Sequence, residues 1–482
     1  METPNFSIFF FPFYTASHIL PMVDTARLFA AHAGVIANLV TTHRNALLFE
    51  NTVNLDIDHG SHIVVHKLDF PCKQVGLPEG VENLNSTTSP EMNRKVFMAV
   101  GLLRQPMEQL LRDYRPDCIV SDMFFPWTVD VAEELGIPRV HFNPTGYFPR
   151  CVLHSLKTYA PHDKVESEAE NFDVPGLPDP IQMKRSQLAG EVKSKTGYAL
   201  LKEKMEEAET RSYGTIMNSF SDLEPAYIQY FQNVKRGKFW TVAPMSLFCR
   251  KSIRNGESNN TINRDQYDFF SWLDSQKPNS VLYVCFGSMV RFSAEQLKEI
   301  AMALEASGKL FLWVCRPPEN IPKGEEWLPE GFEERIRERN VGFLIKGWAP
   351  QVLILDHPSV AGFMNHCGWS SVLEAVTAGV ALITWPLFAE HFYNEKLIVD
   401  VLKTGIEVGS EYWNEGFSIT TPTVTKDKIQ NAVCRFMSGS GEAEEMRRRA
   451  KELKRMANKA VEEGGSSHLD FMALISELKS AK

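Results

Sequence analysis

The sequence predicts an α/β fold in which two doubly wound halves face each other across a cleft. Strand-like apolar runs alternate with helical patterns in two separate series, one beginning at Phe6 and the other at Ser280. Such alternation favours parallel sheets that are covered by helices on both faces. The length of 482 residues, 44% of them hydrophobic and 23% charged, provides enough apolar material for two cores.

The first series opens with a strand, a helix and a second strand. Pro21 falls in the first turn of the predicted helix, where its missing N–H does no harm, and Gly34 ends that helix. The predicted strands are residues 6–13, 35–42, 63–68, 117–122 and 138–142, and the predicted helices are residues 20–33, 127–135 and 198–211. Residues 160–194 lose this periodicity, which predicts a long surface excursion.

The second series repeats the alternation. Ser293 and Gln296 predict a capping box at the start of a helix. The apolar stripe of that helix has helical spacing and consists of Leu297, Ile300, Ala301 and Leu304. The predicted strands are residues 280–288, 310–315, 342–346, 359–364 and 380–385, and two tail helices cover residues 442–463 and 467–478.

A polar, aperiodic stretch between the two series predicts a linker. We therefore expect an N-terminal domain over residues 1–245, a linker over 246–265 and a second domain over 266–460. A last helix over 461–482 is expected to pack back on the first domain.

Composition and charge exclude several classes of protein. The chain has 51 basic and 60 acidic residues, for a net charge of −9, whereas nucleic-acid binders carry a basic face. The eight cysteines are scattered singly, which favours reduced thiols over disulfides or a zinc site. No apolar run approaches the roughly 20 residues of a membrane helix, and no targeting segment is found. We expect a cytoplasmic monomer with no nucleic-acid partner and no transmembrane segment.

A histidine and an aspartate follow two strands of the first series. Ligands of open parallel sheets bind beyond the carboxyl ends of strands, and both His18 and Asp122 fall there. A carboxylate beside an imidazole is the arrangement of a general base. The spacing alone leaves two simpler interpretations open, a helix cap for His18 and a turn former for Asp122.

A segment suited to an anion follows the predicted strand 359–364. Residues 365–371 combine small side chains, Gly368 and two serines before a helix, so that free N–H groups and the helix dipole would meet a phosphate. Ser370 and Ser371 could equally be plain helix caps. The chain contains neither a GxGxxG loop after a strand nor a P-loop, which counts against NAD enzymes and P-loop NTPases.

The sequence predicts no metal site. Asp56 and Asp58 match the acidic pair of metal-dependent glycosyltransferases, but they precede the strand at 63–68, and we interpret them as a solvated turn. His357 and His366 lack the spacing and carboxylate partners of metal ligands. Diphosphate chemistry would then proceed without a metal, and no cofactor is expected.

The residues from 348 to 391 resemble the donor-binding signature box of plant family 1 UDP-glycosyltransferases of the small-molecule type. The box reads WAPQVLILDHPSVAGFMNHCGWSSVLEAVTAGVALITWPLFAEH. The resemblance extends to residues 218–220, 272–274, 286–288 and 464–467, so that it covers essentially the whole chain. Residues 17–29 further resemble the branch that glycosylates saponins and flavonoids.

The resemblance implies a GT-B fold, two Rossmann-like domains of which the N-terminal one takes the acceptor and the C-terminal one the UDP-sugar. It implies His18 as the base and Asp122 as its partner. Trp348 would stack on uracil, the Ala349 backbone would bind its edge, and Gln351 and Glu374 would hold the ribose. The diphosphate would meet Ser288, His366, Ser371 and the N–H groups around Gly368 and Ser370, and the sugar would meet Trp369, Glu390 and His391.

Three positions depart from the family pattern. Ser17 stands where Gly is common, and Ser370 stands where Asn is usual. His391 stands where glucose-using members carry Gln, and His is associated there with galactose or pentose donors. The resemblance therefore leaves glucose and galactose nearly level as the donor sugar.

The expected activity is that of an inverting, metal-independent hexosyltransferase that uses UDP-glucose or UDP-galactose as co-substrate. The acceptor would be a lipophilic plant metabolite, such as a triterpenoid or steroidal saponin aglycone or glycoside. A flavonoid or phenolic acceptor and a pentose donor are the alternatives, and a GT-B epimerase or a non-catalytic sugar-nucleotide-binding protein is the alternative of another class. Aromatic residues of the first half could line the acceptor pocket or belong to the core: Phe124, Phe125, Trp127, Tyr147 and Phe148.

Overall fold

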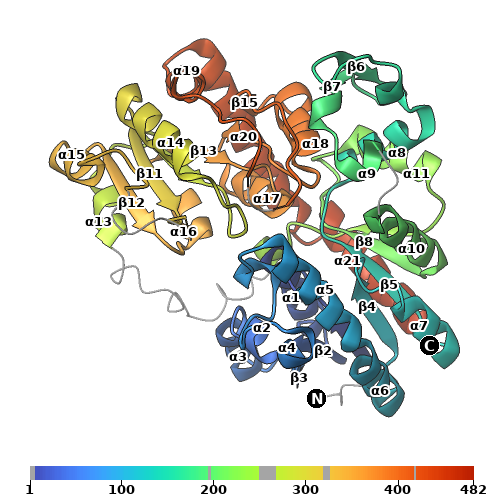
Figure 1. The fold of residues 1–482 in the computed structure, drawn as a ribbon. Coiled ribbons are helices and arrows are strands. Elements are labelled where there is room, and N and C mark those ends of the chain that lie inside the picture. The colour runs from blue at the N-terminus through green and yellow to red at the C-terminus, as the bar shows by residue number, and fades with distance from the viewer. Residues whose placement is uncertain (1–5, 194–196, 249–267, 319–325, 417–418, 482) are drawn as a thin grey trace. The chain divides into compact units, whose positions relative to one another are not determined.

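The computed structural model describes residues 6–193, 197–248, 268–318, 326–416 and 419–481 (Figure 1). The chain divides into two compact units, each made of separate stretches of sequence. The first contains Met1–Tyr147, Lys195–Thr261 and Ala457–Lys482, and the second contains Phe148–Ser194 and Ile262–Met456. The predicted linker over 246–265 lies outside the described residues from position 249 onward.

The first unit is built on a seven-stranded parallel sheet. Its strands in spatial order are β3 (Ile63–Leu68), β2 (Val35–Thr42), β1 (Phe6–Phe11), β4 (Cys118–Asp122), β5 (Arg139–Asn143), β8 (Gly214–Met217) and β9 (Phe239–Thr241). Successive strands run outward from β1 on one side and from β4 on the other. The switch point of this doubly wound sheet, where such folds bind ligands, is therefore between β1 and β4.

The core of the first unit lies between the sheet and the helices α1 (Ala16–Ala30) and α21 (Ser466–Ser480). Phe29 of α1 meets Phe471 of α21 edge to face, with ring centroids 5.1 Å apart. The Asp470 carboxylate accepts a hydrogen bond of 2.8 Å from the N–H of Thr241, at the end of β9. The last helix is thereby part of the core of this unit (Figure 1).

The second unit is built on a six-stranded parallel sheet with the same winding. Its order is β12 (Gly342–Lys346), β11 (Leu310–Cys315), β10 (Val281–Cys285), β13 (Val360–Asn365), β14 (Leu382–Thr384) and β15 (Gly405–Glu407). The switch point here lies between β10 and β13. The two sheets confirm the predicted α/β class with two doubly wound halves.

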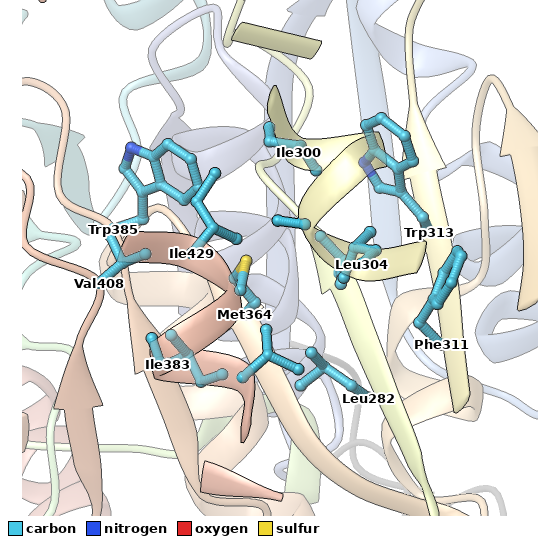
Figure 2. Close-up of a cluster of buried hydrophobic side chains, with 14 of the residues drawn as sticks. Leu282, Ile300, Leu304, Phe311, Trp313, Met364, Ile383, Trp385, Val408 and Ile429 are labelled. Carbon is cyan, nitrogen blue, oxygen red and sulfur yellow. The ribbon is translucent and has the colours of Figure 1, made fainter. Parts of the chain in front are cut away.

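Apolar side chains fill the second unit on one face of its sheet. Met364 of β13 lies beside Ile383 of β14, and Leu282 of β10 belongs to the same cluster, with Ile300 and Leu304 of α14 (Ala294–Ser307) above them (Figure 2). The predicted stripe of α14 is confirmed, since all four of its residues belong to this cluster.

The capping box predicted for α14 is only half formed. Ser293 is the N-cap and its hydroxyl accepts from the N–H of Gln296 at 3.2 Å. The Gln296 side chain bonds instead to both backbone groups of Val424, donating to the carbonyl at 2.9 Å and accepting from the N–H at 2.8 Å. A tertiary contact therefore takes the place of the reciprocal cap.

Two further predictions are corrected. Residues 160–194 are not simply irregular, because β6 (Asn171–Val174) and β7 (Ile181–Lys184) form an antiparallel hairpin that belongs to the second unit. The first helix begins at Ala16 rather than near Leu20, which places His18 in its first turn and Pro21 in its interior.

The remaining helices of four residues or more that the structure describes connect these strands. They are α2 (His43–Ala46), α3 (Glu50–Asp58), α4 (Cys72–Val75), α5 (Pro90–Leu102), α6 (Arg104–Tyr114), α7 (Thr128–Leu135), α8 (Tyr147–Tyr159), α9 (Gly190–Lys193), α10 (Gly197–Arg211), α11 (Pro225–Val234), α13 (Asp268–Asp274), α15 (Phe332–Glu338), α16 (Gln351–Leu355), α17 (Trp369–Ala378), α18 (His391–Lys396), the π-helix Leu397–Val401, α19 (Lys426–Phe436) and α20 (Gly441–Ala460). Within the described ranges, no helix is long and apolar enough to cross a bilayer.

Candidate active site

His18 and Asp122 meet at the switch point of the first unit. His18 follows β1 in the first turn of α1, and Asp122 is the last residue of β4. His18 Nδ1 lies 2.8 Å from Asp122 Oδ2. The carboxylate is fully buried, whereas 16% of the imidazole side chain is exposed. Two residues 104 positions apart in sequence are thus brought together as the strand-end rule predicts.

Both oxygens of the Asp122 carboxylate are engaged, so its orientation is fixed. Oδ1 accepts a hydrogen bond of 3.0 Å from the N–H of Phe124, and Oδ2 faces the imidazole. A carboxylate on Nδ1 keeps the ring hydrogen there and leaves Nε2 with a free lone pair. This geometry suits an imidazole that accepts a proton at Nε2, with the Asp122 carboxylate stabilising the imidazolium that results.

A buried guanidinium on the neighbouring strand interacts electrostatically with Asp122. Arg139 of β5 is 2% exposed, and its Nε donates to Thr128 Oγ1 at 2.7 Å. Thr128 Oγ1 in turn donates to Ser121 Oγ at 2.9 Å, next to Asp122 in β4. Burial lowers the pKa of Arg139 to about 10, while the negative charge of Asp122 acts in the opposite direction. The negative charge of Asp122 thus helps to keep the buried Arg139 guanidinium charged.

Phe13 and Phe124 lie beside His18, and Phe97 packs against both of these rings. Phe13 stacks on Phe124 with a centroid distance of 4.2 Å, and Phe124 lies 5.5 Å from the His18 ring. Phe97 of α5 stacks on Phe13 at 5.4 Å. Phe13 and Phe97 were not among the residues predicted for the acceptor pocket. The position of Phe13 two residues beyond the end of β1 could have pointed to it, whereas no signal in the sequence marks Phe97.

The other residues predicted for the acceptor pocket have different surroundings. Phe125, Tyr147 and Phe148 are fully buried, which fits the alternative of ordinary core residues. Tyr147 Oη forms a hydrogen bond of 2.9 Å with Thr241 Oγ1. Trp127 is partly buried and lies below the guanidinium of Arg104 at 5.6 Å.

The segment suited to an anion lies at the switch point of the second unit. Gly287 and Ser288 follow β10, and the turn from Asn365 to Gly368 connects β13 to α17. Gly368 is the N-cap of α17, so that Ser370 and Ser371 lie inside its first turn. The capping role considered for the two serines is therefore wrong. Their hydroxyls lie instead beside the free N–H groups of a ten-residue helix, where an anion is stabilised.

Two histidines lie edge to face at this switch point. The rings of His366 and His391 are 4.9 Å apart at an interplanar angle of 84°. Burial lowers the pKa of His366 to about 4, and burial together with His366 lowers the pKa of His391 well below its usual value. Both rings are therefore neutral at neutral pH. His391 Nδ1 accepts a long hydrogen bond of 3.4 Å from the N–H of Phe388.

The residues expected at the nucleoside form a connected group. Gln351, the first residue of α16, donates from Nε2 to Glu374 Oε2 at 2.6 Å and to Ser371 Oγ at 3.1 Å. Trp348 is 68% exposed, which leaves its flat face available to a ligand, whereas Ala349 is buried.

The residues expected at the sugar lie nearby in the chain. Glu390 is the N-cap of α18, directly before His391, and Trp369 opens α17 with a buried side chain.

Two residues considered above as possible metal ligands, Asp56 and His357, form contacts that link helices and strands to one another. Asp56 is not in a solvated turn: it lies in α3 and is paired with the buried Arg27, which ties α3 to α1. His357 bonds to Asp274 at 2.9 Å and to Ser359 Oγ at 2.8 Å, at the amino-terminal end of β13, where it links the strand to α13. Within the part of the chain that the structure describes, no group of three or more potential ligands could hold a metal ion.

Known proteins resemble this chain over its whole length. A family model described as "UDP-glucoronosyl and UDP-glucosyl transferase" matches residues 240–433. The solanidine UDP-glucose glucosyltransferase 1 of Solanum tuberosum is 46% identical over 98% of this chain and 97% of its own length. The soyasapogenol B glucuronide galactosyltransferase of Glycine max is 44% identical over 98% and 95%.

A solved structure shows the same fold. UGT73P12 of Glycyrrhiza uralensis, complexed with glycyrrhetinic acid 3-O-monoglucuronide, is 40% identical and superimposes with a TM-score of 0.92 over 99% of this chain and 96% of its own. The identity extends over nearly the whole of each relative, and the two doubly wound sheets are those of the GT-B fold. The chain therefore belongs to the family of UDP-glucuronosyl and UDP-glucosyl transferases and is a UDP-sugar-dependent glycosyltransferase.

Proposed function

We propose that this enzyme is an inverting O-glycosyltransferase that transfers glucose or galactose from its UDP-sugar to a hydroxyl of a lipophilic plant metabolite. The observation that carries the proposal is the pair of His18 and Asp122, 2.8 Å apart at the switch point of the first unit. A protein that only binds a sugar nucleotide needs no such base. The names of the relatives favour a triterpenoid or steroidal saponin aglycone or glycoside as the acceptor.

The reaction requires one proton transfer and one displacement. His18 Nε2 takes the proton of the acceptor hydroxyl, and Asp122 stabilises the imidazolium that forms. The acceptor oxygen attacks the anomeric carbon from the side opposite to the diphosphate. The bond from that carbon to the diphosphate oxygen breaks, UDP leaves with the electron pair, and an α-linked donor gives a β-glycoside.

The second unit would bind the donor and stabilise the leaving UDP. Negative charge grows on the diphosphate as it leaves, and the N–H groups of the first turn of α17 with Ser371, Ser288 and neutral His366 offer donors to it. Trp348 would stack on the uracil, Gln351 and Glu374 would hold the ribose, and Trp369, Glu390 and His391 would contact the sugar. Because these hydrogen-bond donors would stabilise the negative charge that a metal ion otherwise neutralises, the proposal includes activity in excess EDTA.

The first unit would bind the acceptor. Phe124 is partly exposed beside His18 and packs against the partly exposed Phe97 and the buried Phe13, and this apolar surface suits a polycyclic or aromatic acceptor. A flavonoid or phenolic acceptor is the second candidate, because stacked rings also favour planar aromatic ligands. The cytoplasmic location and the monomeric state stay predictions, testable by fractionation and by sedimentation.

The proposal is tested with the variant His18→Ala. We expect its rate of transfer to a phenol or alcohol acceptor to fall about 10²–10⁴-fold, since the base contributes an effect of that size. UDP binding, measured by titration calorimetry, should stay unchanged because the donor residues belong to the second unit. Asp122→Asn should lose less activity, since the imidazole remains.

His59→Ala is the matched control, because His59 is an exposed histidine of the same unit at the end of α3. Transfer by His18→Ala at the wild-type rate would remove the proposed base. Interconversion of UDP-glucose and UDP-galactose without acceptor would instead favour an epimerase, and UDP-sugar binding without any transfer would favour a binding protein.

A further inference from the structure

The turn that precedes α17 contains a residue in a conformation that side chains rarely adopt. Cys367 has φ of +63°, in the left-handed region that favours glycine. Such a conformation has an energetic cost and persists where surrounding contacts enforce it. Cys367 lies between His366 and Gly368, in the segment proposed to meet the diphosphate.

Two buried asparagines hold the backbone of Cys367 from both sides. The Cys367 N–H donates to Asn365 Oδ1 at 2.6 Å. The Cys367 carbonyl accepts from Asn394 Nδ2 at 2.8 Å. Both asparagine side chains are fully buried. Asn365 is two residues away and acts locally, whereas Asn394 comes from α18, 27 residues further along the chain.

Among the described residues, the side chain of Asn394 has no other hydrogen-bond partner. Its Oδ1 is buried and makes no hydrogen bond within the part of the chain that the structure describes. Burying an amide oxygen without a hydrogen-bond partner costs free energy. The one bond that Asn394 does make must help to offset this cost. The contact of Asn394 is thus directed at a single atom, the carbonyl oxygen of the left-handed residue.

The position of His366 depends on this turn. A Cβ atom at Gly287 would lie 2.7 Å from His366 Cε1, and one at Gly368 would lie 2.6 Å from His366 Nε2. The ring is therefore enclosed between two glycines. Its Nδ1 is buried and has no hydrogen-bond partner among the described residues. Since no polar contact from the described residues anchors Nδ1, the backbone of the turn and the packing against the glycines set the direction of the imidazole.

We propose that Asn394 is a positioning residue for the donor diphosphate, which acts by holding Cys367 in its left-handed conformation and thereby directing His366 and the first N–H groups of α17. The proposal rests on the proposed role of this turn in binding UDP. It also connects the diphosphate turn to the sugar end of the site, because α18 carries His391 as its first residue. Asn394 itself does not need to touch the donor.

The variant Asn394→Leu has a similar size and cannot donate a hydrogen bond. We expect its Kd for UDP, measured by titration calorimetry, to rise about tenfold or more, because the buried carbonyl loses its donor and the turn relaxes. The KM for the acceptor should stay within about twofold, since a change confined to donor binding leaves acceptor binding untouched.

A second substitution separates positioning from general damage. Glycine adopts positive φ without cost, so Cys367→Gly removes the reason why the turn needs to be held. We expect the double variant Asn394→Leu/Cys367→Gly to recover most of the UDP affinity, although glycine replaces none of the lost packing. Cys367→Gly alone supplies the reference Kd for UDP against which the recovery in the double variant is measured.

Gln296→Leu is the matched control, because Gln296 is also a buried amide of the second unit that bonds to a backbone carbonyl. It should lower the melting temperature and leave the Kd for UDP unchanged.

Three outcomes would overturn the proposal. The first is a folded Asn394→Leu, or Asn394→Ser if the leucine variant does not fold, that binds UDP as the wild type does. The second is a loss of affinity that Cys367→Gly does not recover. The third is the failure of all Asn394 variants to fold with or without Cys367→Gly, which would make Asn394 a residue of the fold. A wild-type protein that does not bind UDP would instead contradict the proposed function.

Discussion

His391 begins α18 with one ring nitrogen already in use. Its Nδ1 accepts from the N–H of Phe388, and burial keeps the ring neutral by lowering its pKa. A neutral imidazole that accepts at Nδ1 carries its hydrogen on Nε2. The ring therefore offers a donor sugar one N–H, whereas glutamine would offer both an amide donor and a carbonyl acceptor.

This difference predicts a shift in donor preference in the variant His391→Gln. Glucose and galactose differ only in the orientation of the 4-hydroxyl, and a buried hydroxyl without its partner costs about 1–3 kcal/mol. We expect the glucose-to-galactose ratio of kcat/KM to rise roughly tenfold or more toward glucose. The measurement is a competition assay with both UDP-sugars and one acceptor. A ratio within about twofold of the wild type would mean that His391 does not select the sugar.

Single functional residues were predictable where a general rule of the fold class gives their position. The strand-end rule identified His18 and Asp122, because the carboxyl ends of parallel strands meet at one edge whatever lies between them. Arg139 was not predicted, because its partners on α7 and α10 are brought to it by tertiary packing. Phe97 lies on a helix whose exposed and buried faces the sequence did not separate.

Helix α17 depends on glycines that bring its N-terminus close to His366. A Cβ at Gly368 would approach His366 Nε2 to 2.6 Å, although Gly368 itself has an ordinary φ of −63°. We expect Gly368→Ala to displace the imidazole and to raise the KM for the UDP-sugar about tenfold, an effect of steric origin. Steady-state kinetics with varied donor measures it.

Gly439→Ala is the control for this prediction. Gly439 lies between α19 and α20, and a Cβ there would meet no atom within 4 Å. Its kinetics should equal those of the wild type. Wild-type donor kinetics in Gly368→Ala would show that the ring tolerates the added methyl group and that His366 has no fixed place in donor binding.

Helices and strands were predictable where the local pattern is strong. The predictions were wrong where a contact between residues distant in sequence determined the structure. The strands β2, β11 and β12 have the predicted bounds, because apolar residues make up most of each strand. Gln296 forms no reciprocal cap, since Val424 offers it two backbone bonds. Asp56 belongs to α3 rather than to a solvated turn, and its partly buried carboxylate pairs with Arg27 of α1.

At the scale of the whole molecule, each unit is assembled from non-adjacent stretches of chain. The second unit takes in residues 148–194, and the first takes in residues 457–482. The sequence predicted two doubly wound halves but placed residues 148–194 in the first. Local periodicity cannot reveal that Lys184 pairs with Glu411 at 2.8 Å and that the Ser186 hydroxyl donates to the Glu411 carbonyl at 2.6 Å.

Helix α21 should contribute strongly to the stability of the first unit. Leu474 is fully buried in the core that contains β1 and α1, whereas Leu469 of the same helix is 56% exposed. We expect Leu474→Ala to lower the free energy of unfolding by about 2–5 kcal/mol and Leu469→Ala to change it by less than about 0.5 kcal/mol. Denaturant titration of both variants checks this. Equal effects would mean that α21 does not form part of the core in solution.

The late position of α21 in the chain has a consequence for biosynthesis. Thr241 and Asp470, whose hydrogen bond joins β9 to α21, are 229 residues apart. A ribosome that adds 5–20 residues per second needs about 10–50 s to cover that distance. During this interval the apolar face that Phe471 and Leu474 later cover is exposed on a nascent chain. We therefore expect the yield of folded enzyme during expression to depend on chaperones that shield this face until translation ends.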